Sequence, residues 1–465
     1  MIRHQGVWAG SSLALLPNWV FASADAGQKL DLSRHWVGYG SLGLFVVAYV
    51  LVVFEETLNL RKSKPMMLAA ALIWAGIALV YRQANLAPIA EAAMRQDVLD
   101  YSEVLLFLVV SLAYINAMEE RLVFANLRAW LVNRGYGYRQ LFWLTGVLAF
   151  LVSSLTNNMA TAMLMCAVVM AVGKDNPKFV AISCVNIVVA ANAGGTFCPL
   201  GDITTLLVWQ KGPVAFLTFY KLFLPALLNF TIPAAIMAYA VPDEKPQALR
   251  EAIHMRRGAR RIVALFLLAI LTAVGFEYLL RLPAAAGMMA GLSYLQFFSY
   301  YLRLTDFSAS HRGDGKPIDF DIFTQVARLE WDTLLFFYGV VLCLGGINFI
   351  GYLAHASGFL YGGAMGAASA NILVGLLSSV VDNIPLMLAI VTMHPDMSTG
   401  QWLLVTLTAG VGGSLLSVGS AAGITLMGQA KGVYTFTSHL KWTPVIFLGY
   451  IGSIAAHFFL NADLF

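Results

Sequence analysis

Two short polar motifs occur twice in this chain, in the same order, inside otherwise apolar stretches. The first copy reads S-S-L-T-N-N over residues 153–158 and G-G-T-F-C-P-L-G-D over residues 194–202. The second copy reads S-S-V-V-D-N over residues 378–383 and G-G-S-L-L-S-V-G-S over residues 412–420. Interrupted, glycine-rich segments at matching positions of two halves are typical of membrane carriers, which bind cargo between the repeats. The duplication therefore predicts one transport site built from both copies.

Two carboxylates lie at the centres of these motifs, Asp202 in the first copy and Asp382 in the second. A charge at this depth costs about 2.5–3.5 kcal/mol on insertion scales, which makes each a candidate functional residue. Their counterparts in the other copy are neutral, Ser420 and Asn157. A desolvated carboxylate that holds either a proton or a metal ion can exchange one for the other. The two Asp residues are thus the predicted cation and proton carriers.

The groups around the two carboxylates are oxygen-bearing side chains, and hard cations such as sodium prefer oxygen ligands. The predicted cation- and proton-binding set is Asp202, Asp382, Asn157, Asn158, Asn383, Ser153, Ser378, Asn192, Thr204, Thr205, Ser417 and Ser420. Within this set, Na⁺ itself is expected at Asp202, Asp382, Asn158 and Asn383. No resident cofactor is predicted, because the sodium or lithium ions and the protons are cargo.

Glycines are expected to break two helices at the site. The apolar stretches 178–210 and 400–430 are too long for one straight crossing. The residues predicted to interrupt them are Gly194, Gly195, Gly201, Gly412, Gly413 and Gly419. Glycine can free backbone groups for a cation, and it can also let helices pack closely. Two matched copies, each with a polar partner, favour the broken helix over simple close packing.

The composition requires an integral membrane protein. Hydrophobic residues make up 59% of the chain and charged residues 12%, with a mean hydropathy of +0.74. Soluble domains carry about 25% charged residues. Apolar runs long enough to cross a bilayer recur without strict alternation, so the spans are helices rather than barrel strands. The ten predicted spans are 39–58, 66–82, 103–119, 178–210, 214–240, 262–280, 283–302, 333–353, 400–430 and 441–460.

Two further apolar stretches, 141–173 and 359–393, each carry one S-S-x-x-[ND]-N motif near the middle. Polar residues there would be costly against lipid but are tolerated where they line a cavity. Both stretches are predicted to be re-entrant hairpins, one in each of two inverted repeats. The expected divisions are a leader at 1–24, N-terminal scaffold helices at 25–102, repeat 1 at 103–240, a basic cytoplasmic linker at 241–261 and repeat 2 at 262–465.

Most of the 29 Lys and Arg residues fall on alternate connections, as the positive-inside rule requires. These clusters indicate membrane orientation rather than nucleic-acid binding, and they place both termini outside. Residues 1–24 resemble a cleavable signal peptide, with Ala22-Ser23-Ala24 as the cleavage site. An interfacial leader is the alternative, because Pro17 and Asn18 interrupt the apolar core.

Several other polar residues carry a weaker signal. Three acidic pairs sit at predicted span ends, where solvated carboxylates are unremarkable: Glu55 with Glu56, Glu119 with Glu120, and Glu330 with Asp332. Glu277 and Arg281 are four residues apart and are expected to pair with one another. The four cysteines fall in apolar segments without metal-binding spacing, which indicates packing.

From residue 105 to the last span, the motif blocks resemble the NhaD-type sodium/proton antiporters of the ion transporter superfamily. The specific blocks are G-D-I-T-T after Leu200 and V-D-N-I-P after Val380. The resemblance implies exchange of Na⁺ or Li⁺ for H⁺ at a bacterial inner membrane, an elevator-like transport domain holding both hairpins, and a homodimer through the scaffold helices. It also implies that the family's ion-site residues fall on the set given above, Asn157 excepted. One departure stands out: the family has Asp-Asn in the first hairpin, and this chain has Asn157-Asn158.

Three alternatives remain open at the level of sequence. A sodium-coupled carrier of dicarboxylates or similar oxyanions would belong to the same superfamily, although two acidic residues at the site would repel an anion. A sensor that binds sodium without transport could retain the same site. A membrane enzyme would need a nucleophile–base pair or a metal cluster in the spans, and the sequence offers neither.

Overall fold

The computed structural model describes residues 30–465 except 59, 212–213, 246–252, 311–319 and 363–365. The predicted leader at 1–24 lies outside these residues. Within the described part of the chain all regular structure is helical, and every one of the ten predicted spans coincides with a helix or a helix pair. Seven helices there are long and apolar enough to cross a membrane, or eight if one bent pair counts as a span. The prediction of an all-α integral membrane protein is confirmed.

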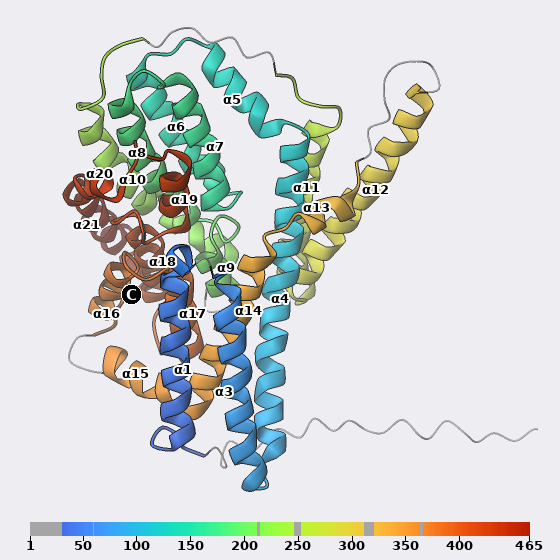
Figure 1. The fold of residues 1–465 in the computed structure, drawn as a ribbon, viewed down its shortest axis with the longest axis vertical. Helices are drawn as coiled ribbons and strands as arrows, with labels where there is room; N and C mark the ends of the chain where they lie inside the picture. Colours follow the sequence, from blue (N-terminus) through green and yellow to red (C-terminus); the bar gives the residue numbers. More distant parts are fainter. Residues whose placement is uncertain (1–29, 59, 212–213, 246–252, 311–319, 363–365) are drawn as a thin grey trace, which may run out of the picture.

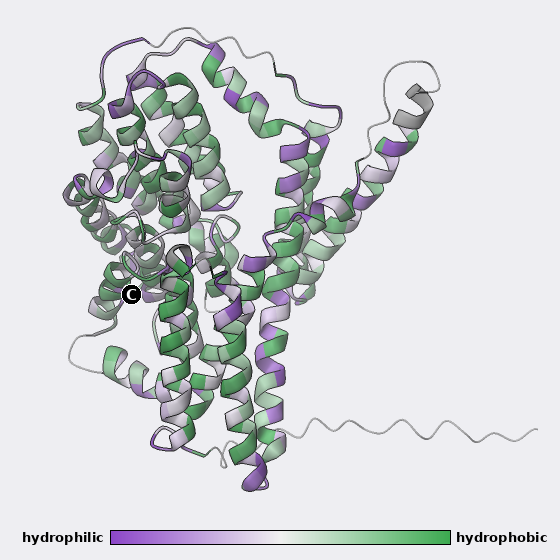
Figure 2. Ribbon diagram, viewed as in Figure 1, coloured by the Kyte–Doolittle hydropathy of each residue, from purple (hydrophilic) through white to green (hydrophobic). Residues whose placement is uncertain are grey.

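Figure 2 shows apolar residues along most of the length of these helices. Many large apolar side chains are exposed there, among them Leu271 at 67% and Phe297 at 76%. Exposed apolar area on this scale is expected when lipid rather than water surrounds the helices.

One group of helices forms a body that we name the scaffold. Its helices are α1 (Trp36–Val53), α2 (Glu55–Leu58), α3 (Ser63–Gln83), α4 (Ala87–Glu120), α11 (Ala259–Gly275), η2 (Phe276–Leu280), α12 (Ala284–Ser310), α13 (Ile322–Ala327) and α14 (Trp331–Ile350). Helix α4 runs beside both α1–α3 and α11–α12, and it packs on α3, α12 and α14 (Figure 1). Glycine also permits close packing between α14 and α3, because a Cβ on Gly339 of α14 would lie 2.7 Å from Met66 of α3.

The second group forms a body that we name the transport domain. Its helices are α6 (Tyr138–Ser153), α7 (Asn158–Val172), α8 (Pro177–Gly195), α9 (Ile203–Gln210), η1 (Phe216–Leu222), α10 (Phe223–Ala238), α16 (Gly366–Leu377), α17 (Asn383–Met393), α18 (Thr399–Gly412), α19 (Ala421–Gln429), α20 (Phe436–Leu440), α21 (Thr443–Leu460) and η3 (Ala462–Leu464). Helices α8 and α18 lie at its centre and are almost entirely buried. Helix α5 (Val123–Asn133) joins α4 to this body, and α15 (Tyr352–Tyr361) joins α14 to it.

Both predicted hairpins and both predicted helix breaks are present. Stretch 141–173 folds into antiparallel α6 and α7 around a turn at residues 154–157, and α16 and α17 flank a turn at residues 378–382. Helix α8 is interrupted before α9 at residues 196–202, and α18 before α19 at residues 413–420. Figure 1 shows α6–α8 in the upper part of the view and α16 with α18 lower down, so the two copies approach each other from opposite ends.

The motif glycines act mainly through close contact. A Cβ on Gly194 would lie 2.1 Å from the Phe150 carbonyl oxygen, and one on Gly412 would lie 1.9 Å from the Gly375 carbonyl oxygen. Both glycines lie in the last turn of a helix, within two residues of the break that follows. Close packing and helix interruption therefore occur together at these glycines, although they were alternative interpretations of the sequence.

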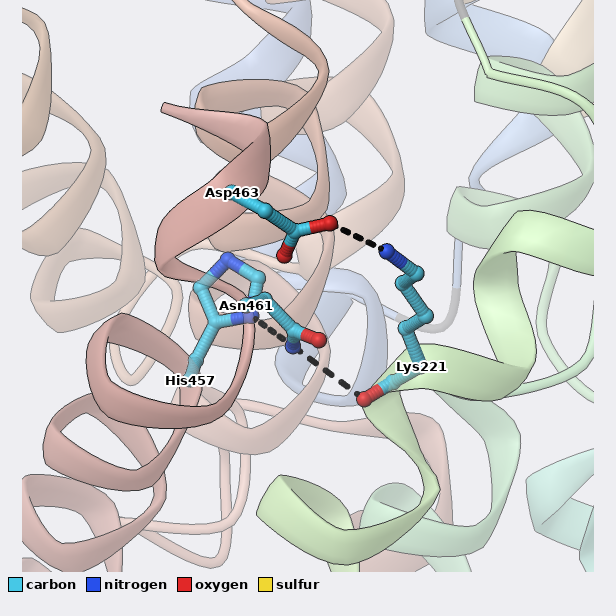
Figure 3. Close-up of polar contacts among 4 residues, drawn as sticks. All are labelled: Lys221, His457, Asn461 and Asp463. Carbon is cyan, nitrogen blue, oxygen red and sulfur yellow. Dashed lines mark hydrogen bonds and ion pairs between the residues drawn. The ribbon is translucent and has the colours of Figure 1, made fainter.

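The C-terminus is tied to the end of η1 within the transport domain (Figure 3). Lys221 Nζ lies 3.0 Å from Asp463 Oδ2, and Asn461 Nδ2 donates to the Lys221 carbonyl at 3.2 Å. His457 lies 2.9 Å from the same Asn461 amide through Nδ1 and 2.9 Å from the Gly400 carbonyl through Nε2. The hydrogen bond from Lys221 lowers the pKa of Asp463, which favours the ionised carboxylate.

We expect Gly412→Ala to destabilise the protein by about 1–3 kcal/mol or more, because the added methyl group would push α16 away from α18. The measurement is the apparent melting temperature of the purified protein in detergent. Gly428→Ala is the matched control on α19, since a Cβ there meets nothing within 4 Å. Equal melting temperatures for the two variants would contradict this account of the glycine.

Candidate functional site

Each hairpin is fastened to its broken helix by the same serine contact. Ser153 Oγ donates to the Ala191 carbonyl of α8 at 2.7 Å, and Ser378 Oγ donates to the Ala409 carbonyl of α18 at 2.7 Å. These two carbonyls lie three residues before Gly194 and Gly412. The serines therefore hold each hairpin tip beside a helix break, and their predicted part in cation binding stays a prediction.

Four short polar residues stand at the starts of the four helices that meet here. Asn157, Asp202, Asp382 and Ser420 are the N-cap residues of α7, α9, α17 and α19. Asp202 Oδ1 accepts from Thr204 N at 3.1 Å, and Ser420 Oγ accepts from Gly423 N at 3.3 Å. Helix N-termini stabilise nearby negative charge, which lowers the cost of burying the two carboxylates.

Asp202 is the point at which both hairpins meet. Its Oδ2 accepts from Asn158 Nδ2 at 2.9 Å, at the first hairpin tip, and from Asn383 Nδ2 at 3.3 Å, at the second. The Asp202 side chain is buried, with 8% of its surface exposed. Sequence positions 181 residues apart are thus joined through one carboxylate.

Asp382 lies next to this cluster and within electrostatic reach of Asp202. Its Oδ1 is buried and has no hydrogen-bond partner among the described residues. The same holds for Thr204 Oγ1 and Ser417 Oγ at the two helix breaks. Buried polar atoms normally have partners. Unpartnered oxygens of carboxylate and hydroxyl groups are the chemistry that a hard monovalent cation uses.

The remaining predicted residues divide into two groups. Asn192 bridges the two broken helices, because its Nδ2 donates to Ser420 Oγ at 3.0 Å while its Oδ1 faces Asn158 Nδ2 at 3.4 Å. Thr205 Oγ1 donates to the Gly195 carbonyl at 3.2 Å and so holds α9 against α8. Asn192 therefore belongs to the polar cluster around Asp202, whereas the Thr205 hydroxyl stabilises the break between α8 and α9.

A cavity leads toward the cluster from one side. A space of about 680 Å³ lies between α4, α5 and the first hairpin, and Glu119, Arg128 and Asn157 line it. A second space of about 60 Å³ is lined by Asn157 and Asp202. Glu330 lines both spaces. Asn157 therefore stands between the larger cavity and the buried carboxylate.

Sequence reasoning missed or misplaced three residues near the site. It treated Glu330 as an ordinary carboxylate at a span end, although Glu330 faces both cavities. It gave no signal for Tyr49 of α1 or Lys62 at the start of α3, both of which interact electrostatically with Asp382. These two belong to scaffold segments outside the repeated motifs, so nothing in the duplication could point to them.

The predicted pairing of Glu277 with Arg281 is wrong. Glu277 Oε1 accepts from Trp209 Nε1 at 2.9 Å, and its other oxygen is buried without a partner among the described residues. The segment Phe276–Leu280 is a π-helical turn, in which residues four apart no longer share a face as they do in an α-helix. Glu277 consequently points to α9 in the transport domain.

Comparison with known proteins agrees with this architecture. Residues 49–410 match the family model described as "Citrate transporter" (CitMHS). The chain is 53% identical to "Na(+)/H(+) antiporter NhaD" of Vibrio cholerae over 98% of both chains, and 53% identical to the protein of the same name from Halomonas elongata over 100% of this chain and 97% of that one. It is 27% identical to "Sodium/proton antiporter 1" of Arabidopsis thaliana over 96% of this chain and 74% of that one. The chain therefore belongs to the NhaD-type sodium/proton antiporter family, within the ion transporter superfamily.

Proposed function

We propose that this protein is a secondary antiporter that exchanges Na⁺ or Li⁺ for H⁺ across the bacterial inner membrane. The proposal rests above all on Asp202, a buried carboxylate contacted by both hairpin tips, beside the unpartnered Oδ1 of Asp382. Relatives at 53% identity that are named as Na(+)/H(+) antiporters support the same exchange.

The exchange follows from competition for the two carboxyl groups. A cation needs ionised oxygens, whereas a proton neutralises them, so one guest leaves when the other binds. Asp202 and Asp382 lie within electrostatic reach of each other, so a proton on one carboxyl group would favour ionisation of the other. The side-chain amides of Asn158 and Asn383 each donate to Asp202 Oδ2. Asn158 Oδ1 also lies 2.7 Å from Ser153 Oγ, and an amide oxygen with two lone pairs can still serve as a neutral cation ligand.

The polar cavity indicates how the cargo reaches the site. The space of about 680 Å³ carries acidic and basic side chains, and it adjoins the smaller space that Asp202 lines. The basic segments around α5 and before α11 flank the same end of the molecule, which the positive-inside rule assigns to the cytoplasm. We infer that the described conformation opens toward the cytoplasm.

Alternating access would be elevator-like, with the transport domain moving against the scaffold. Support comes from an apolar space of about 420 Å³ between the two bodies, lined by Phe45, Leu344 and Leu386. Two polar links join the end of α9 to the scaffold: Lys211 pairs with Asp100 of α4, and Trp209 donates to Glu277. Movement of the transport domain would have to break both links. The scaffold helices, with their exposed apolar faces, would form the proposed homodimer.

The second candidate function is sodium-coupled uptake of a dicarboxylate or similar oxyanion. The family model described as "Citrate transporter" favours it, as do the helix N-termini at the site. Against it, Asp202 already occupies the place between the two hairpin tips. Sodium-dependent uptake of labelled succinate or citrate by vesicles, without sodium-driven change of internal pH, would establish this alternative.

Asp202→Asn and Asp382→Asn are each expected to lower exchange by at least about tenfold, because the variants lose the ionised oxygens that hold the cation. The measurement is the sodium-driven pH change in everted vesicles with matched protein amounts. Glu91→Gln is the control, since Glu91 is an exposed carboxylate on α4 that pairs only with Arg95 among the described residues. Exchange retained in both Asp variants would exclude the proposed carriers.

Asn157→Asp is expected to change the ratio of protons to sodium ions or the pH range of exchange. The variant places a third carboxylate between the large cavity and Asp202. Stoichiometry is read from reversal potentials in proteoliposomes, and the pH range from exchange rates. Asn157→Ser controls for the N-cap, because serine can replace the Asn157 Oδ1 contact with Ala160 N. An unchanged ratio and pH profile would refute the role assigned to this position.

A disulfide between Asp100→Cys and Lys211→Cys is expected to stop exchange, because it would fix α9 to the scaffold. Reduction should restore activity. The matched control is Lys221→Cys with Asp463→Cys, a cross-link in place of an ion pair inside the transport domain (Figure 3). Exchange that continues through the first cross-link would show that these elements do not separate during transport.

A further inference from the structure

A strongly basic cavity lies away from the transport site, at the start of α11. Its volume is about 490 Å³, which is within the range of small-molecule sites. Asn126 of α5 lines one side, and Arg256, Arg257, Arg260 and Arg261 supply four of its nine lining residues. None of the described residues that line it carries a carboxylate. The cavity therefore favours an anionic occupant.

Contacts with Arg121 hold the loop that carries these arginines in place. Arg256 N donates to the Arg121 carbonyl at 3.0 Å, and Arg121 Nη1 donates to the Arg257 carbonyl at 3.5 Å. Arg121 is fully buried, and its guanidinium lies 4.3 Å from the centre of the Phe320 ring. The buried arginine thus shapes the loop while the neighbouring guanidinium groups line the cavity.

Three of the four arginines that line the cavity have no acidic partner among the described residues. Among the described residues, no acidic side chain forms an ion pair with Arg256, Arg260 or Arg261. Arg261 instead lies 5.9 Å from the ring centre of Tyr301 on α12. Three positive charges on one concave surface, with no acidic partner among the described residues, attract an anion from the surroundings.

The helix below the cavity suits acyl chains. Arg260 begins a face of α11 that continues through Leu267 and Leu271, spaced as residues on one side of a helix. These leucines are 43% and 67% exposed. Of the seven membrane-span candidates, the one containing α11 has the smallest buried share, 28%. A cationic cavity directly above an apolar helix face matches a phospholipid better than a free anion.

We propose that this cavity binds the headgroup of an anionic phospholipid, with the acyl chains lying along the exposed face of α11. The position places the lipid beside two of the three chain connections between scaffold and transport domain, since α5 lines the cavity and the linker that follows α10 forms its loop.

The test uses the purified, delipidated full chain in detergent and native mass spectrometry with phosphatidylglycerol or phosphatidylcholine. We expect retained phosphatidylglycerol on the wild type, little retained phosphatidylcholine, and a loss of at least about tenfold in phosphatidylglycerol affinity for Arg256→Gln with Arg260→Gln. Lys174→Gln with Lys178→Gln removes the same charge at another exposed basic pair and should leave affinity unchanged. Melting temperatures in phosphatidylcholine verify that both variants are folded.

Three results would overturn the proposal. Equal binding of the two lipids by the wild type would show that the arginines do not select an anionic headgroup. Equal losses in the two double variants would indicate general surface charge rather than a site. Displacement of phosphatidylglycerol by millimolar inorganic phosphate would identify the cavity as a site for the free anion.

Discussion

The structure around the candidate site depends on one constraint, the burial of the Asp202 carboxylate. An ionised carboxylate away from water must be compensated by hydrogen bonds and positive charge. Here the compensation comes from the N-terminus of α9 and from two asparagine amides, one at each hairpin tip. Because those tips belong to different halves of the chain, the charge can be buried only when both halves are assembled around it.

The packing around this carboxylate explains the matched glycines. A hairpin tip reaches a helix break only if its own helix lies backbone against backbone on the broken helix. Gly194 and Gly412 allow that approach at equivalent places, and the serine contacts at Ala191 and Ala409 then fix the register. Neither glycine has a positive φ angle. Their small size, rather than backbone freedom, is what the fold uses.

Much of this arrangement could be predicted because the two polar motifs occur twice in the sequence. A motif that recurs in the same order specifies equivalent local structures, so hairpins, breaks and the two acidic residues followed from the sequence. The contacts between unlike elements did not follow. Tyr49, Lys62 and Glu330 approach the site from scaffold segments that have no copy among the motifs. The Glu277 contact depends on a π-helical turn, which a rule based on α-helical spacing cannot anticipate.

The two copies differ in where they carry an acidic residue. In the first hairpin, Asn157 Oδ1 accepts a hydrogen bond from Ala160 N at 2.6 Å and so caps the N-terminus of α7. In the second, Asp382 keeps a buried oxygen without a partner among the described residues. The helix breaks reverse this asymmetry, with Asp202 in the first and neutral Ser420 in the second. Each half thus contributes one carboxylate, from different elements. A structurally duplicated frame thereby holds a chemically unsymmetrical pair, in which one carboxylate joins the two halves while the other retains coordination capacity for a guest.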